Sequence, residues 1–338
     1  MQLYAGIELQ ANNSVVVVLD EADRILYQKR LHNELGALLQ ALAPYPDPRQ
    51  GIVVASTYNW YWVVDGLMAA GYRVHLANTT AIEQYKGLKH TDAQSDARWL
   101  AHLLRVRILP EGDIYAQEER AVRELLRKRS QLVRHRTSNL LSIQNLLTRN
   151  TGSTLSGNRI KQLTVTEVEQ ILPQAELALA VKSNLAVLQC LEEQIERIEE
   201  VVLARLKLRA GFQPLLTVSG IGQILGMTIM VETGESGRFA TVGDFASYCR
   251  CVSSQKLSNG KRKGQGNTTN GTKYLAWAFV EAANFAIRSN AQINRVSQRK
   301  QAKTKGVVAI KAVAHKLARA WYYILRDQVP FAVDKALA

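Results

Sequence analysis

The sequence has few cysteines and no long apolar run. Its three cysteines, Cys190, Cys249 and Cys251, are too few for a disulfide framework. Cys249-x-Cys251 has no second pair and the histidines are scattered, so neither predicts a zinc site. No segment reaches the roughly 18 apolar residues that a membrane span needs, and the N-terminus lacks a charged signal region. We therefore expect a reduced, cytoplasmic protein with no membrane partner.

Acidic residues are almost absent between Arg250 and Arg326. This stretch holds 16 lysines and arginines and one acid, Glu281, whereas the 338-residue chain has a net charge of +14. The excess positive charge is therefore concentrated in the C-terminal part. Such a block favours a polyanion partner, nucleic acid above all, because Lys and Arg release counterions from phosphates. A solvated face that keeps the chain soluble is the alternative.

Short connections separate the first three predicted strands, at 3–9, 14–20 and 24–31. Such links are too short for parallel crossovers, so these strands form an antiparallel meander. Alternating helices and strands follow, which is the ribonuclease-H-like layout. A flavodoxin-like sheet would need a helix after the first strand, and there is no room for one. The later elements are expected at 34–43 (helix), 51–56 (strand), 60–70 (helix), 73–78 (strand), and about 80–86 and 94–106 (helices).

Two long helices are predicted in the middle of the chain, at 117–149 and 176–206. The second has apolar residues at spacings of 3, 4, 3 and 4, which is typical of a coiled-coil seam. This seam packs either within a helical hairpin or between two copies in a dimer. The seam residues are Leu188, Leu191, Ile195, Ile198 and Val202. The first helix carries basic residues that we expect to bind nucleic acid, namely Arg120, Arg123, Arg127, Lys128, Arg129, Arg134 and Arg136.

Residues 215–232 resemble a helix-hairpin-helix. Gly220 and Gly222 stand between two apolar segments, where glycine lets backbone N–H groups approach a phosphate at a helix N-terminus. A dinucleotide-binding turn is rejected, because the preceding segment reads as a helix and not as a strand. A plain helical turn without DNA contact is the alternative.

Residues 253–273 contain almost no apolar residue and predict a loop or a hairpin. Ser258 lies there beside cations that could stabilise a phosphodiester transition state. Ser253 and Ser254 are competitors, and from chemistry alone a serine in a basic loop is more often an ordinary loop residue. Helices are expected to resume at 274–290 and 306–327. The cations expected to contact nucleic acid are Lys256, Lys261, Arg262, Lys263 and Lys273.

Three acids of the first domain are candidate magnesium ligands and catalytic residues. Glu8 lies on the first predicted strand, and Asp92 and Asp96 are spaced to share one helix face. Asp92 could equally cap the helix that contains Asp96. The strand at 51–56 offers no carboxylate, so the metal signal is weak.

Several longer motifs together resemble the DEDD transposases of insertion-sequence family 110, its group 1111 in particular. The Piv-type DNA invertases are relatives of this family. The similarity extends from about residue 3 to 335. The motifs are STYNWYWVVDGLMAAGYRVHLANTTAI (56–82), SDARWLAHLL (95–104), ILPEGDIY (108–115), NLLSIQNLL (139–147), FASYCRCV (245–252), LSNGKRKGQGN (257–267) and KYLAWAFVEAANFAI (273–287).

The resemblance implies a RuvC-like domain at 1–112, a helical coiled-coil domain at 113–207, and a mostly helical transposase domain at 208–338. The fold class is thus α/β plus all-α. It also implies a bacterial, nucleoid-associated recombinase that binds double-stranded DNA and is guided by a structured bridge RNA. Such proteins act as dimers or tetramers, hold Mg²⁺ with four acids, and form a covalent serine–DNA intermediate. The serine of the family falls on Ser258.

The four acids of the family transfer incompletely. The first falls on Glu8 and the last on Asp96, whereas the other two positions hold Ala55 and Ala93. Asp92 adjoins the second lost acid. Losing hard oxygen ligands from such a site should cripple metal-dependent cleavage. We therefore expect either a bridge-RNA-guided transposase with a degraded metal site or an RNA-guided DNA-binding regulator derived from one. A site-specific invertase is a third, weaker alternative.

Overall fold

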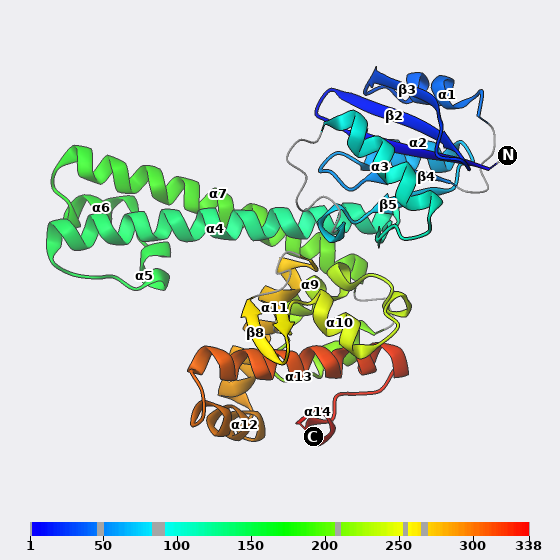
Figure 1. Cartoon of the computed structure of the whole chain (residues 1–338). Coiled ribbons are helices and arrows are strands. Elements are labelled where there is room, and N and C mark those ends of the chain that lie inside the picture. Colours follow the sequence, from blue (N-terminus) through cyan, green and yellow to red (C-terminus); the bar gives the residue numbers. More distant parts are fainter. Residues whose placement is uncertain are drawn as a thin grey trace. The chain divides into compact units, whose positions relative to one another are not determined.

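The structure is a computed structural model that describes residues 2–45, 51–82, 92–206, 211–252, 256–264 and 270–337. The chain divides into two compact units, Met1–Gln117 and Glu118–Ala338 (Figure 1). The three-domain division expected from the sequence stays a prediction. No helix in the described ranges is both long and apolar enough to cross a membrane.

A six-stranded mixed sheet forms the centre of the first unit, in the order β3-β2-β1-β4-β5-β6. Strand β1 pairs antiparallel with β2 and parallel with β4, and β2 pairs antiparallel with β3. This confirms the predicted meander followed by parallel strands. The strands are β1 (Leu3–Leu9), β2 (Asn13–Asp20), β3 (Ile25–His32), β4 (Ile52–Ala55), β5 (Val74–Ala77) and β6 (Glu111–Gly112).

Helices cover both faces of this sheet. One face packs against α1 (Leu35–Leu42) and α2 (Tyr61–Ala69), and the other packs against α3 (Ala93–Arg105). Alternate residues of the strands supply the two cores, as the two-residue repeat of a strand requires. Of the helix expected at about 80–86, Thr79–Ala81 forms a single 3₁₀ turn. The remainder beyond residue 82 lies outside the described residues.

A helical hairpin begins the second unit, formed by α4 (Gln117–Thr151) and α7 (Ala175–Leu206). The two helices lie side by side, and α5 (Gly157–Lys161) and α6 (Val165–Ile171) pack at their far end (Figure 1). The seam residues Leu188, Ile195 and Val202 are buried within this single chain. They therefore pack as the hairpin alternative requires, and the coiled-coil dimer stays a prediction.

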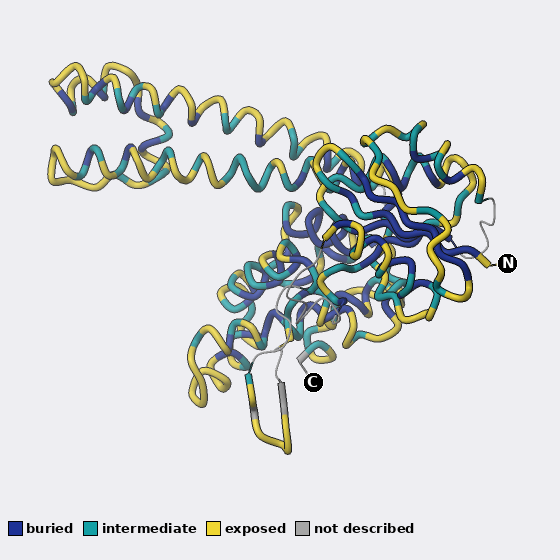
Figure 2. The backbone as a smooth tube through the Cα atoms, turned by 45° about the horizontal axis from the view of Figure 1, so that its top comes forward, coloured by how far each residue is buried: buried dark blue, intermediate teal, exposed yellow. Residues whose placement is uncertain are grey.

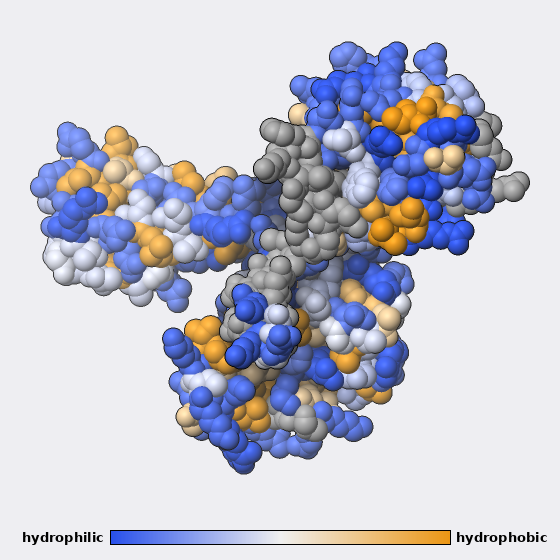
Figure 3. All heavy atoms as spheres, viewed as in Figure 1, coloured by the Kyte–Doolittle hydropathy of each residue, from blue (hydrophilic) through white to orange (hydrophobic). Residues whose placement is uncertain are grey.

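The remaining helices of this unit pack around α11 (Lys273–Ser289) and α13 (Gly306–Asp327). The buried residues of these two helices include Phe279 and Trp321. Figure 2 shows the buried backbone of this bundle and the exposed outer turns of the helical hairpin. Figure 3 shows hydrophilic side chains over much of the outer surface of the C-terminal helices. The elements are α8 (Phe212–Leu216), α9 (Gln223–Thr233), a 3₁₀ turn (Ser236–Arg238), α10 (Val242–Tyr248), β7 (Lys256–Ser258), β8 (Lys261–Gly264), α11 (Lys273–Ser289), α12 (Ala291–Gln301), α13 (Gly306–Asp327) and α14 (Val333–Leu337).

Candidate active site and nucleic-acid interface

Two of the predicted acids face each other between β1 and α3. Gly6 allows this approach, because a Cβ atom there would lie 2.0 Å from the carbonyl oxygen of Ala97. Glu8 lies two residues farther along the same face of β1, opposite the first turn of α3, which carries Asp96. Burial and the nearby charge of Asp96 raise the pKa of Glu8 to about 7. Burial and Asp92 likewise raise the pKa of Asp96.

Asp92 caps helix α3. Its Oδ1 accepts a 2.7 Å hydrogen bond from the backbone N–H of Ser95, and its own backbone N–H donates to Ser95 Oγ. This is a capping box, and these hydrogen bonds lower the pKa of the Asp92 carboxyl. The capping alternative for Asp92 is therefore confirmed. One carboxylate oxygen of Asp92 is engaged by the helix that Asp96 enters.

Ala55 and Ala93 occupy the two positions at which the resemblance leads us to expect acids. Ala55, at the end of β4, is completely buried, and Ala93 is 8% exposed in the contact between α3 and β2. Neither provides an oxygen ligand. Within the described residues, no group of three or more His, Cys, Asp or Glu side chains is arranged to hold a metal ion. The described acids therefore do not make up the donor set that a four-carboxylate magnesium site requires.

The segment after β4 contains polar contacts that the sequence did not reveal. Asn59 donates from Nδ2 to the carbonyl oxygen of Gln10 (3.0 Å), and Thr57 donates from Oγ1 to Asn59 Oδ1 (3.0 Å). These bonds hold residues 57–59 against the end of β1, near Glu8. Tyr58 between them is 82% exposed.

Ser258 lies at the tip of a two-stranded antiparallel hairpin formed by β7 and β8. Asn259 and Gly260 both have positive φ, 50° and 71°, as a two-residue hairpin turn requires. Ser258 is exposed and is the cross-strand neighbour of Lys261, which is exposed as well. The expectation of a loop or hairpin is therefore resolved as a hairpin for residues 256–264.

The other residues of this segment are described less completely. Lys263 is exposed on β8, and Lys273 is exposed at the start of α11, with its Nζ 5.5 Å from the centre of the Tyr274 ring. Lys256 and Arg262 lie on the two strands, but their side chains are outside the described ones, as are Ser253 and Ser254 entirely. The described part of the hairpin thus presents one serine hydroxyl with two exposed ammonium groups.

Three arginines of α4 are directed into the protein. Arg123 and Arg127 bind the buried carboxylate of Glu232, and Arg120 is itself buried. Arg123 Nε donates to Glu232 Oε2 (3.0 Å), and Arg127 donates to both carboxylate oxygens of Glu232 (2.8 and 3.1 Å). Although burial opposes its charged form, Arg127 has a raised pKa because of Glu232. Thr272, the cap of α11, donates to Glu232 as well (3.3 Å), and Arg120 is 4% exposed. This placement corrects the expectation of nucleic-acid contact for these three arginines in favour of a structural role.

Two further arginines of α4 pair with acids of α7. Arg129 donates to Glu199 (2.7 Å) and Arg136 lies 3.8 Å from Glu192, so both serve the hairpin. Lys128 and Arg134 are exposed on the same helix. Of the seven basic residues predicted on α4 to bind nucleic acid, these two have the surface position that such binding needs.

The turn between α8 and α9 separates the roles of its two glycines. Gly220 has a φ of +86°, and a Cβ atom there would lie 2.2 Å from the carbonyl oxygen of Ala282. It is therefore required for packing against α11. Gly222 precedes α9 without a side-chain cap, and a Cβ atom there would meet no atom within 4 Å. Helix α9 begins without a side-chain cap after Gly222, and the phosphate contact expected at Gly220 and Gly222 stays a prediction.

Comparison with known proteins identifies the family. Residues 5–150 match the DEDD transposase model of insertion-sequence family 110, described as Transposase, and residues 213–298 match the Transposase IS116/IS110/IS902 family. The chain belongs to this family of transposases. A protein described as a probable family 20 transposase of Pseudomonas aeruginosa is 28% identical over 283 residues, covering 78% of this chain and 80% of its own length.

Family membership makes the chain a DNA-acting enzyme of the transposase class. The DEDD domain implies a RuvC-like fold for the first unit, in agreement with its strand order. It also suggests the use of a divalent metal ion, and the metal-ligand role of Glu8 and Asp96 stays a prediction.

Proposed function

We propose that this transposase cuts and joins DNA strands through Ser258, guided by a structured RNA. The observation that carries the proposal is the position of Ser258, exposed at a hairpin tip with Lys261 opposite it. A serine in that position can reach a phosphodiester, and neighbouring cations stabilise the charge of the transition state.

The reaction needs no external energy source. Ser258 Oγ attacks phosphorus, a Ser–O–P bond forms, and one bridging P–O bond of the DNA breaks. The proton that leaves Ser258 Oγ is taken up by the leaving oxygen of the DNA, which becomes a hydroxyl group. Attack of another strand's hydroxyl on the phosphoserine reverses these bonds and joins the strands. The phosphodiester bond energy is conserved throughout.

The cations proposed to hold the nucleic acids are those with exposed side chains. Lys261 and Lys263 lie on the serine hairpin, and Lys273 begins the next helix. Lys128 and Arg134 extend the surface along α4. The resemblance to bridge-RNA-guided recombinases supports a structured RNA as the guide and double-stranded DNA as the substrate.

Self-association into a dimer or tetramer is part of the proposal. Leu179, Val187 and Val201 are 61%, 47% and 49% exposed on α7. Their spacings of 8 and 14 residues place them within one face of the helix. An exposed apolar stripe of this kind would be covered by a second copy of the chain, which sedimentation velocity would reveal as a species of at least twice the monomer mass.

A second candidate function is an RNA-guided DNA-binding regulator without strand joining. The observation that favours it is the replacement of two family acids by Ala55 and Ala93. The two functions are distinguished by incubating the purified protein with its RNA and with donor and target DNA. Joined strands that require both the RNA and Ser258 support the recombinase. Tight RNA-dependent DNA binding without joined strands supports the regulator.

A further inference from the structure

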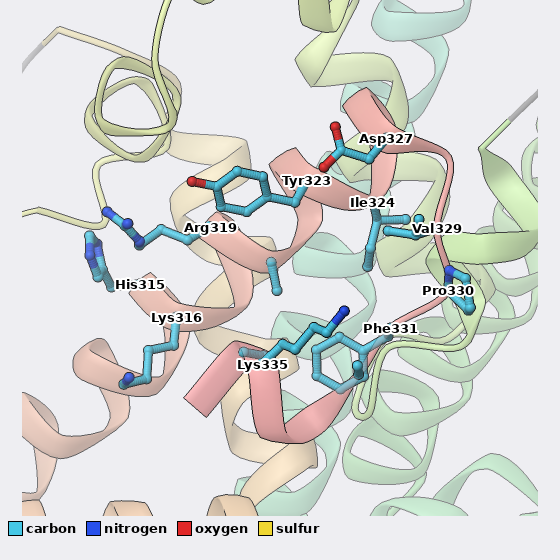
Figure 4. Close-up of a pocket in the computed structure, with 13 residues that line it drawn as sticks. His315, Lys316, Arg319, Tyr323, Ile324, Asp327, Val329, Pro330, Phe331 and Lys335 are labelled. Atoms are coloured by element: carbon cyan, nitrogen blue, oxygen red, sulfur yellow. The ribbon is translucent and has the colours of Figure 1, made fainter. Parts of the chain in front are cut away.

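A pocket of about 830 Å³ lies between the C-terminal half of α13 and the short helix α14 (Figure 4). The chain reverses between these helices at Gln328, whose φ is 52°. Helix α14 is anchored by a hydrogen bond from Gln292 on α12 to Asp334 (3.1 Å), and the backbone N–H of Phe331 donates to Thr217 Oγ1 (3.3 Å). The pocket is thus part of the folded bundle, and its volume is within the range of ligand sites.

The polar side of this pocket is positively charged. Lys316 and Arg319 line it from α13, and Lys335 lines it from α14. Asp327 is the acid among the lining residues, and Arg326 already pairs with both of its carboxylate oxygens. The pocket therefore has an excess of cationic groups, which favours an anionic ligand.

His315 adds a hydrogen-bonding group to the same side. Figure 4 shows its ring beside the guanidinium of Arg319. Burial, Arg319 and Lys316 lower the pKa of His315, so the imidazole is neutral at pH 7. Its Nδ1 is buried and has no hydrogen-bond partner among the described residues.

Aromatic and aliphatic groups form the rest of the lining. Tyr323 is 37% exposed, and Arg326 lies over its ring at 4.9 Å, which fixes its orientation. Phe331, Val329 and Ile324 contribute apolar surface, and Figure 4 shows Lys335 extending toward Phe331 and Ile324. A small inorganic anion would leave this apolar part of the pocket empty.

We propose that this pocket binds one unpaired nucleotide of a nucleic-acid strand. The phosphates on the two sides of this nucleotide would be held by Arg319 and Lys335, which line opposite ends of the pocket, and the base would stack on the ring of Tyr323. Aromatic rings beside cations are the combination that single strands use, because every base has a face that can stack. A base that remains stacked and paired in a duplex cannot enter a concave pocket. The inference rests on nucleic-acid binding by this transposase and is independent of any chemistry at Ser258.

The test uses fluorescence anisotropy with three labelled probes, an eight-nucleotide oligo(U), the matching oligo(dT), and a 12-base-pair DNA duplex. The pocket variant is Arg319→Ala with Lys335→Ala. Its matched control is Arg299→Ala with Lys303→Ala, which removes the same charge from exposed positions outside the pocket. The pocket variant should weaken single-strand binding at least fivefold more than the control variant does. The pocket variant and the control variant should lower duplex binding equally.

Tyr323→Ala and Tyr323→Phe separate stacking from charge. Tyr323→Ala should weaken oligonucleotide binding about five- to tenfold, and Tyr323→Phe should restore it, because the ring is kept. A larger loss for oligo(U) than for oligo(dT) assigns the pocket to RNA, and the reverse assigns it to displaced DNA. The proposal is overturned if the pocket variant matches its control on both single strands, or if the duplex loses as much affinity as they do.

Two controls keep these outcomes separate from other causes. Thermal unfolding of each variant should match wild type, since the substituted side chains are partly exposed. Ser258→Ala should bind all three probes like wild type, whereas it should lose strand joining. Failure of the pocket proposal and failure of the Ser258 proposal are therefore read from different measurements.

Discussion

Glu232 in the second unit is buried and Glu8 in the first unit is partly buried, and the surroundings of these two carboxylates differ. Glu232 in the second unit is hydrogen-bonded by Arg123, Arg127 and Thr272. Glu8 in the first unit lies beside another acid, Asp96, and its pKa is raised to about 7 by burial and by that acid. The protein thus satisfies the charge of Glu232 but opposes the charge of Glu8. A carboxylate kept in such an unfavourable place is typical of a functional site, whereas Glu232 stabilises the fold.

Removing Glu232 should have the largest effect on stability. Glu232→Ala leaves two arginines without their shared carboxylate, and breaking a buried pair by removing one partner costs about 3–5 kcal/mol. Urea unfolding of the second unit should show this loss. Glu199→Ala removes a more exposed partner of Arg129 and should cost less than about 1 kcal/mol. Equal losses in the two variants would contradict the structural role of Glu232.

Replacing Glu8 should have the opposite sign and depend on pH. The pKa of Glu8 in the folded state lies above its ordinary value of 4.5, so the folded state loses stability as pH rises from about 4.5 to 7. Glu8→Gln has no charge to bury. It should therefore be more stable than wild type by about 2–3 kcal/mol at pH 8 and about equal to it at pH 4.5. Urea unfolding at both pH values checks this prediction. If Glu8→Gln were less stable than wild type at pH 8, the folded protein would not disfavour the charged form of Glu8.

Restoring the two missing acids should turn the Glu8 site into a better cation site. Ala55→Glu with Ala93→Asp places carboxylates at the positions that the family uses, so Mn²⁺ should bind at least about tenfold more tightly than to wild type, a gain of about 1.4 kcal/mol. Isothermal titration gives the affinity. The triple variant that adds Glu8→Gln should lose this gain. If the restored acids gave no gain, the alanines would not explain a weakened metal site.

The smallest effect on stability is expected from the exposed cations of α4. Lys128→Ala with Arg134→Ala should change the free energy of unfolding by less than about 0.5 kcal/mol. The same variant should flatten the salt dependence of DNA binding by roughly one to two in slope, since it removes up to two phosphate contacts. An unchanged slope would remove Lys128 and Arg134 from the proposed interface.

The comparison of Glu8 with Glu232 also shows which features of the structure can be predicted from the sequence. The strands of the first unit and the helix of Asp96 followed from hydrophobic pattern and connection length, since these are local properties. The partner of Arg127 did not, because Glu232 lies 105 residues away and charge alone does not say which cation is buried. Likewise, the two glycines of the turn before α9 have the same sequence signal, and the contact of Gly220 with Ala282 is a tertiary property.

Ser258 shows a third case. Its hairpin was one of two structures that the composition of residues 253–273 allowed, and its chemical role came from the family motif and not from the residues alone. The pocket between α13 and α14 has no sequence signal. Lys316 and Arg319 belong to a basic block with many similar cations, and Lys335 lies on α14, which is only five residues long.

The central claim is that Ser258 forms the covalent bond to DNA. The most direct test is mass spectrometry of the protein–DNA adduct after incubation with RNA and DNA, quenching in detergent and digestion with protease and nuclease. We expect a nucleotide attached to the peptide that contains Ser258, and no adduct in Ser258→Ala. Attachment at Ser253 or Ser254, or undiminished adduct in Ser258→Ala, would contradict it.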